Sequence, residues 1–229
     1  MAMLRQAATG TDRLSVSSTV GEGGGEHEPA GLELLRDGMT YDLVGAAPGA
    51  GFTVPSARHR VGVAADLVEQ DCEALALQPG PHLASGAHAL PVVRTMMGAA
   101  SMLVPHLVGL RAVAWPAAGT LIGPDFFVST MTAWIAGGAF PALGLTAFAA
   151  DPDDGLRSEG LAFFTGQELR LEPGLAEDHA AGVRLGIRLV NHLVGQGRVR
   201  DIEAIMGPSG EQLTLSPNAA SHVVSVRRG

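Results

Sequence analysis

The clearest pattern of apolar and polar positions lies between residues 142 and 206. From Leu175 to Val194 apolar side chains recur every three or four residues, which is the period of a helix with one buried face. Pro173-Gly174 precedes this segment, and Gly195 and Gly197 follow it. These residues are typical of helix boundaries. We therefore expect a helix from about residue 175 to residue 194.

A period of two appears just before that helix. Leucines alternate there with the charged residues Glu168, Arg170 and Glu172. Such alternation is typical of a strand with one buried face and one solvated, charged face. The apolar run 143–149 ends in a cluster of turn residues. We expect 143–149 and 160–172 to form a β-hairpin closed by a long acidic loop.

The remaining pattern predicts short strands and two more helices. The helices are expected from about Pro91, with Pro105 as a kink or an end, and from 126 to about 136. Strands are expected at 31–36, 41–47, 59–67, 74–77, 111–115, 198–206, 212–215 and 222–227. This order of elements predicts an α+β fold, in which three main helices pack on a mainly antiparallel sheet.

The first 29 residues differ from the rest in composition. They are polar and rich in glycine, and they offer little apolar surface to offset the entropy of ordering. We expect residues 1–29 to form a flexible, disordered leader. A single α+β domain is expected over residues 30–229.

Charge and cysteine content exclude several function classes. The chain contains no lysine and has a formal net charge of −8, without an arginine-rich run. Schiff-base chemistry and a P-loop are therefore excluded, and a nucleic-acid partner is not expected. The single Cys72 excludes an intrachain disulfide and a cysteine-based metal cluster.

Targeting and membrane signals are weak along the chain. Residues 1–10 lack the apolar segment of a secretory signal. Residues 126–150 carry no charge, but Gly137-Gly138 and Pro141 interrupt them, so they read as buried structure. We expect a cytoplasmic protein without a membrane partner.

Three segments of the chain resemble one family. They are Ala112-Val-Ala-Trp-Pro-Ala-Ala-Gly119, the aromatic helix with Trp134, and Gly160-Leu161 through Phe164-Thr-Gly-Gln-Glu168. In these segments the chain is similar to the bacterial "domain of unknown function 4261" family, over roughly residues 60–227. The resemblance implies a bacterial α+β domain of unassigned function. It supplies no catalytic residues.

Two groups of residues are candidates for a site. His82, His88 and His106 would bind a metal ion if carboxylates converged on them, because imidazole suits zinc and other transition metals. No defined ligand spacing is present, so solvated or structurally bonded histidines are the alternative. Trp115 and Trp134 would line a ligand pocket, or else pack in the core. The sequence identifies neither a catalytic residue nor a cofactor.

These observations lead to two functional hypotheses. The first is a non-enzymatic binding or assembly module that self-associates, because segment 90–150 is more apolar than one core requires. The alternative is a small-molecule or metal-dependent enzyme that uses the region of His82, His88 and His106.

Overall fold

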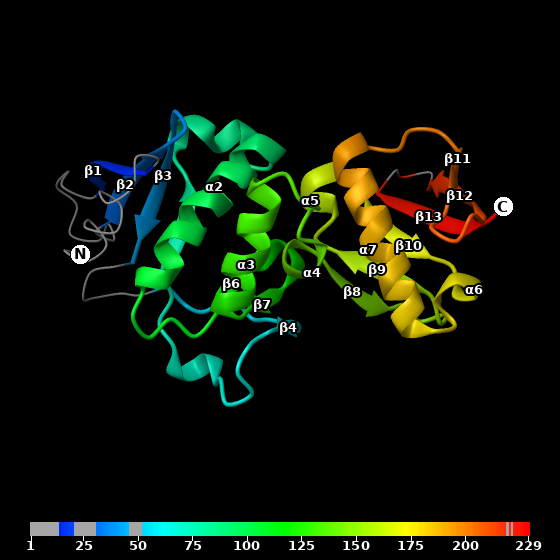
Figure 1. Ribbon diagram of the computed structural model, residues 1–229, viewed down its shortest axis with the longest axis horizontal. Helices are drawn as coiled ribbons and strands as arrows, with labels where there is room; N and C mark the ends of the chain where they lie inside the picture. Colours follow the sequence, from blue (N-terminus) through cyan, green and yellow to red (C-terminus); the bar gives the residue numbers. More distant parts are fainter. Residues whose placement is uncertain (1–13, 21–30, 46–51, 219, 221) are drawn as a thin grey trace. The chain divides into compact units, whose positions relative to one another are not determined.

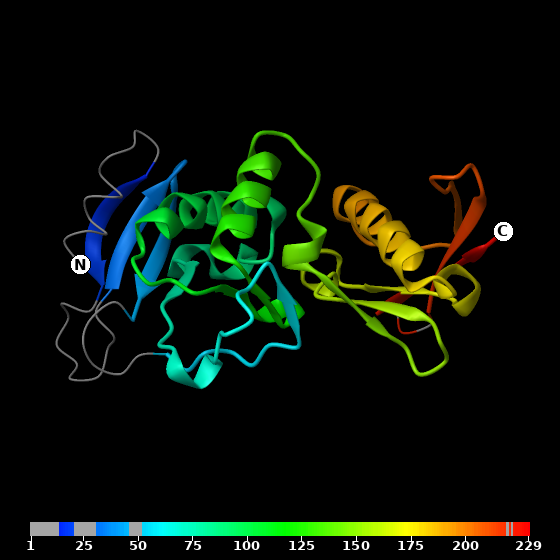
Figure 2. The same cartoon turned by 60° about the horizontal axis from the view of Figure 1, so that its bottom comes forward.

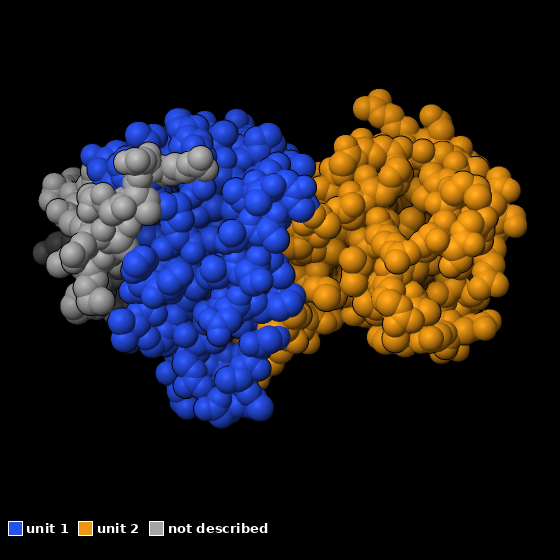
Figure 3. All heavy atoms as spheres, in the orientation of Figure 1, with its two compact units in different colours: residues 1–56, 62–114, 122–138 blue, residues 57–61, 115–121, 139–229 orange. Residues whose placement is uncertain are grey.

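The computed structural model describes residues 14–20, 31–45, 52–218, 220 and 222–229 (Figure 1). The chain divides into two compact units, which are coloured separately in Figure 3. Unit 1 comprises residues 1–56, 62–114 and 122–138, and unit 2 comprises residues 57–61, 115–121 and 139–229. The expected single domain over residues 30–229 stays a prediction.

A four-stranded antiparallel sheet in the order β1-β2-β3-β5 forms one layer of unit 1. Its strands are β1 (Ser15–Val20), β2 (Gly31–Arg36), β3 (Met39–Val44) and β5 (Ala76–Pro79). Asp37 and Gly38 join β2 to β3 with φ values of 47° and 77°. Positive φ at both central residues is the geometry of a type I′ hairpin turn, which Asp-Gly favours.

Helix α2 (Leu90–Leu103) packs on this sheet. The buried cluster between the two consists of Leu14, Leu32, Leu34, Leu43, Ala99 and Leu103. The helix begins with Pro91 at its first turn and ends before Pro105, as its sequence predicts. Helix α3 (Pro124–Ile135) lies beside it, and Arg94 Nη2 donates to the carbonyl oxygens of Trp134 and Ile135 at 3.2 and 2.9 Å.

The leader prediction is wrong for the residues of β1. Ser15–Val20 pairs antiparallel with β2, and the side chain of Leu14 is only 2% exposed. Leu14 and Val16 alternate with serines, which is a strand pattern that the average composition of residues 1–29 concealed. The other leader residues, 1–13 and 21–29, lie outside the described part of the chain.

Unit 2 is built on a six-stranded sheet in the order β11-β12-β13-β10-β9-β8. The strands are β8 (Ala147–Ala150), β9 (Leu156–Glu159), β10 (Glu168–Leu171), β11 (Glu203–Met206), β12 (Gln212–Pro217) and β13 (Val223–Arg228). The central pair β10–β13 is parallel and its neighbours are antiparallel. The predicted strands 198–206, 212–215 and 222–227 are observed as β11, β12 and β13, although β11 begins only at Glu203.

Helix α7 (His179–Gln196) lies over one face of this sheet (Figure 2). The face beneath it is buried, and its strand residues include Leu169, Leu171, Leu213, Leu215, Val224 and Val226. Gly186 permits the close approach of α7 to β8, because a Cβ at that position would lie 2.5 Å from the Phe148 ring. The opposite sheet face carries mostly polar and charged side chains.

The predicted start of this helix needs correction. Residues 173–176 form a separate turn, α6 (Pro173–Ala176), and α7 begins only at His179. The Asp178 carboxylate accepts hydrogen bonds from the backbone N–H groups of Ala180 and Ala181 at 2.9 and 3.2 Å. This N-cap satisfies backbone donors that the first turn leaves unpaired, so it fixes where the helix starts.

The predicted hairpin also needs correction. Strand β8 pairs with β9, while residues 162–165 form the short helix α5 (Ala162–Thr165) rather than strand. The preceding run 142–145 is helical as well, as α4 (Ala142–Leu145). Both segments are too short and too uniformly apolar for periodicity to separate strand from helix.

Glu168 holds α5 in place. Its Oε1 accepts from the backbone N–H groups of Gly160 and Ala162 at 2.9 and 3.1 Å, and its Oε2 accepts from Leu161 N–H at 3.2 Å and from the Ser158 hydroxyl. The prediction that Glu168 lies on a solvated strand face is therefore wrong, because its carboxylate binds the backbone N–H groups of residues 160–162.

Short elements complete the described chain. Strands β4 (His59–Val61), β7 (Thr120–Ile122) and β6 (Val113–Trp115) form a three-stranded sheet in that order. Short 3₁₀ helices lie at Glu69–Asp71, Pro81–Gly86, Val104–His106 and Pro116–Ala118. A mixed α+β fold with mostly antiparallel sheets is confirmed, although the strands form three sheets instead of one. None of the helices in the described ranges is long and apolar enough to cross a membrane.

Replacing Glu168 with alanine should destabilise unit 2. Three backbone N–H groups would lose a charged acceptor, so we expect the free energy of unfolding to fall by about 3 kcal/mol. Glu172→Ala, which removes a carboxylate from the same side of the same segment, should change it by less than about 0.5 kcal/mol. Urea unfolding followed by circular dichroism measures both, and equal effects of the two substitutions would contradict this role for Glu168.

Tyr41 offers a direct probe of unit 1, because it is the chain's single tyrosine. Its hydroxyl donates to the Val92 carbonyl oxygen at 3.0 Å, and burial raises its pKa to about 12. Phenolate absorbance should therefore appear near pH 12 in the folded protein and near pH 10 in guanidinium. A midpoint near the lower value in the folded protein would show that Tyr41 is solvated.

Candidate functional site

The two tryptophans predicted to bind a ligand are both buried. Trp115 is 8% exposed and donates its indole N–H to the Leu145 carbonyl oxygen at 3.0 Å. The ring packs edge-on against Phe163, with centroids 5.1 Å apart, and stacks near Phe164. Trp134 is 5% exposed, and the Arg94 guanidinium lies 5.8 Å from its ring centroid. Packing accounts for both indoles, and their ligand-binding role stays a prediction.

His82 is the predicted metal ligand with the most polar surroundings. Its Nδ1 lies 3.3 Å from Thr40 Oγ1 on β3. Asp42, two residues further along the same strand face, is 8% exposed. Burial raises the pKa of Asp42, the carboxylate of its cross-strand neighbour Glu33 raises it further, and His82 lowers it. A buried carboxylate beside a histidine is a common arrangement at functional sites.

The other two histidines lie on separate segments of unit 1. His88 lies in the turn that leads into α2, and His106 is exposed at the end of the 3₁₀ helix Val104–His106. Across the described ranges, no group of three or more His, Cys, Asp or Glu side chains is placed to hold a metal ion. The metal role of His82, His88 and His106 therefore has no geometric support and stays a prediction.

Unit 2 contains a second polar cluster, which no pattern in the sequence predicts. Glu159, the last residue of β9, accepts hydrogen bonds through Oε2 from His59 Nε2 at 2.8 Å and from Arg58 Nη2 at 2.9 Å. Backbone N–H groups of Arg58 and His59 also donate to the Gly119 carbonyl oxygen. Glu159 lies 101 positions after Arg58 and 100 positions after His59 in the sequence, so spacing along the chain carried no signal.

The charge balance of this cluster favours an ionised carboxylate. Burial raises the pKa of Glu159, but the hydrogen bonds from His59 and Arg58 outweigh it and leave that pKa below its ordinary value. A carboxylate that orients an imidazole is one element of general-base catalysis. Within the described chain, however, no Ser, Thr or Cys side chain forms a hydrogen bond with His59. We therefore interpret the cluster as a tether between β4 and β9.

The most exposed apolar surface of unit 2 lies at strand β11. Ile202, just before the strand, is 71% exposed, and Met206 at its end is 69% exposed. Ala204 between them is also exposed. The strand is the first in the sheet order and pairs only with β12 in the described chain. Figure 1 shows β11 at the margin of the sheet, beside β12.

The apolar segment 90–150, in contrast, is largely buried. Val108 at 89% and Leu143 at 41% are its large apolar side chains that are exposed. Most of its other large side chains, such as Met97, Phe127 and Met131, are core residues. Apolar content alone could not distinguish this segment from residues 202–206. The exposure of Ala204 and Met206 follows from their place on the uncovered face of an edge strand.

The Glu159 cluster predicts a pH dependence of stability. Because the folded state lowers the pKa of this carboxyl, the unfolded chain takes up the proton first as the pH falls. The stabilisation is complete above the pKa of the unfolded carboxyl and is lost progressively as the pH drops towards the folded one. Glu159→Gln, which keeps an acceptor but does not titrate, should flatten the loss of stability between about pH 6 and pH 3.

Urea unfolding at a series of pH values provides the measurement, and Glu177→Gln on the exposed surface is the control. An acid limb that is the same in wild type and Glu159→Gln would exclude the tether.

Comparison with protein-family models, curated proteins and solved structures finds no match to the chain. The resemblance to the "domain of unknown function 4261" family therefore stays a prediction.

Proposed function

We propose that the protein is a non-enzymatic binding or assembly module of the cytoplasm, and that it self-associates through strand β11. The observation that carries the proposal is the apolar, exposed edge formed by Ile202, Ala204 and Met206. An unpaired strand edge is a template for another strand, and natural proteins usually protect such edges with lysine, proline or an inward-pointing charge. This chain has no lysine, and β11 contains no proline. Its one charged residue, Glu203, lies on the helix-covered face, where its carboxylate accepts hydrogen bonds from the Gln196 side chain of α7.

The hydrogen bonds between β11 and β12 determine which backbone groups of β11 point away from β12. The Gly207 N–H donates to the Glu211 carbonyl oxygen at 2.7 Å, in register with the pairs Ile205↔Leu213 and Glu203↔Leu215. In an antiparallel ladder the hydrogen-bonded pairs alternate. The N–H and C=O groups of Glu203 and Ile205 thus face β12, whereas those of Ala204 and Met206 face the free edge.

A second copy of the chain fits this edge by symmetry. Most homo-oligomers are two-fold symmetric, and two antiparallel β11 strands satisfy a two-fold axis. With the axis at Ala204, Ile202 of one copy lies opposite Met206 of the other. Glu203 then lies opposite Ile205, so no like charges meet across the new pair. Backbone hydrogen bonds would supply affinity, and the apolar side chains would supply the register.

An enzyme that acts on a small molecule or uses a metal ion is the second candidate, in the region of His82, His88 and His106. The observation that favours it is the buried Asp42, whose raised pKa and proximity to His82 are typical of acid–base groups. Stoichiometric metal in the purified protein that is lost in His82→Ala would support this candidate over the first.

Proline at position 204 should separate assembly from folding. The Ala204 N–H faces the free edge, so Ala204→Pro removes a donor for a second copy without breaking the β11–β12 ladder. We expect the wild type to be a dimer by light scattering and Ala204→Pro to be a monomer with a similar melting temperature. Ile205→Pro, one residue away, removes a ladder hydrogen bond and should lower the melting temperature instead.

A monodisperse wild-type monomer would overturn the proposal. So would a dimer that persists in Ala204→Pro.

A further inference from the structure

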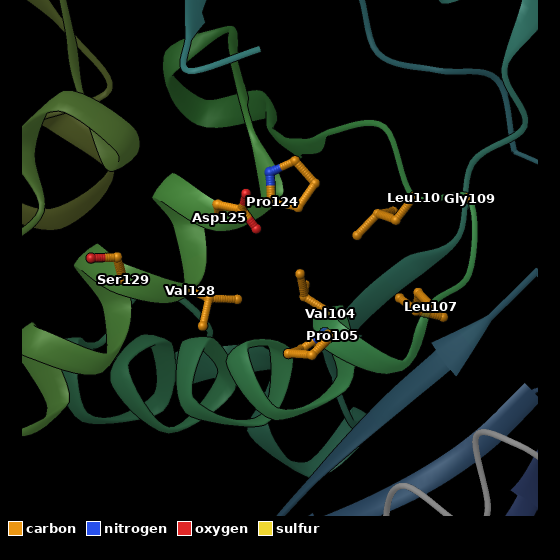
Figure 4. Close-up of a pocket in the computed structure, with 9 residues that line it drawn as sticks. All are labelled: Val104, Pro105, Leu107, Gly109, Leu110, Pro124, Asp125, Val128 and Ser129. Atoms are coloured by element: carbon orange, nitrogen blue, oxygen red, sulfur yellow. The ribbon is translucent and has the colours of Figure 1, made fainter. Parts of the chain in front are cut away.

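A hollow of about 420 Å³ lies in unit 1, between the end of α2 and the start of α3. Figure 4 shows its lining. On one side are Val104, Pro105 and the loop with Leu107 and Leu110, and on the other are the first turns of α3, with Val128. The volume falls within the range of small-molecule sites, which are mostly apolar with a few polar groups.

The main polar group directed into this hollow is Asp125. Figure 4 shows its carboxylate turned towards the space bounded by Val104 and Leu110, whereas the Ser129 hydroxyl points away from it. Asp125 is exposed, and no Arg or His of the described chain forms an ion pair with it. The chain has no lysine that could serve as a partner. The hollow therefore combines apolar walls with one negative charge.

We propose that this hollow binds a small organic cation, specifically a primary ammonium group on a compact apolar body. The apolar body would remove the half-buried side chains of Leu107, Leu110 and Val128 from water, which supplies the main driving force. The ammonium group would pair with the Asp125 carboxylate. An anionic ligand would be repelled by this carboxylate, and a neutral apolar ligand would remove water from it without providing a partner.

Three ring compounds of matched shape test the charge requirement. Cyclohexylmethylamine carries the ammonium group, cyclohexylmethanol is neutral, and cyclohexanecarboxylate is anionic. Methyl resonances of Val104, Leu107, Leu110 and Val128 report binding by NMR titration of the full chain. We expect saturable shifts with the amine, binding about fivefold weaker with the alcohol, and none with the carboxylate. Added salt should weaken the binding of the amine but not the binding of the alcohol.

Variants of unit 1 assign the effect to this site. Asp125→Asn should lower the affinity for the amine to that for the alcohol. Asp71→Asn removes the same charge away from the hollow and should leave the affinity for the amine unchanged. Val128→Trp fills the hollow and should abolish binding of both compounds. Circular dichroism of each variant checks that the helices remain.

Several results would overturn the inference: no saturable shift of these methyl groups with the amine, equal affinity for amine and alcohol in the wild type, or unchanged amine binding in Asp125→Asn. Because these variants lie in unit 1 and the assembly variants lie on β11, failure of one proposal leaves the other open to its own test.

Discussion

The carboxylate of Glu168 is the constraint on which much of unit 2 depends. It collects three consecutive backbone N–H groups of the turn 160–162 and the hydroxyl of Ser158. The turn then closes into α5, whose Phe163 and Phe164 pack on Trp115. The same turn ends β9 at Glu159, where Arg58 and His59 attach. One charged side chain thus sets a strand end, an aromatic cluster and an ionic tether, because buried backbone donors must find acceptors.

The sequence predicted those elements whose cause is local. The start of α2 near Pro91 and the strands observed as β12 and β13 each follow from a few adjacent residues. The failures share a different cause. Glu168 reaches back to residues 160–162, and Glu159 contacts His59 at a separation of 100 positions, so neither contact leaves a period or a motif. Strand β1 was missed because its alternation is short and lies within a glycine-rich composition.

The candidate sites show the same limit. Residue type alone made His82 a candidate, and its neighbour Asp42 belongs to a strand 40 residues earlier, so no local pattern linked the two. The three histidines share a chemistry but not a location. Exposure of Ile202 and Met206 depends on the sheet order, since the same residues on a central strand would lie next to paired neighbours. Apolar composition therefore indicates how much apolar surface the fold must bury, but not which apolar side chains stay exposed.

Strand β13 lies between β12 and β10, and it follows both of them in the chain. The strands β8-β9-β10 and β11-β12 are consequently synthesised before β13, and in the sheet order these two groups are not neighbours. The insertion of β13 joins them, with a parallel ladder on one side and an antiparallel ladder on the other. Until the ribosome has released these residues, the sheet has additional open edges, so a stalled or shortened chain exposes more strand surface than the finished protein.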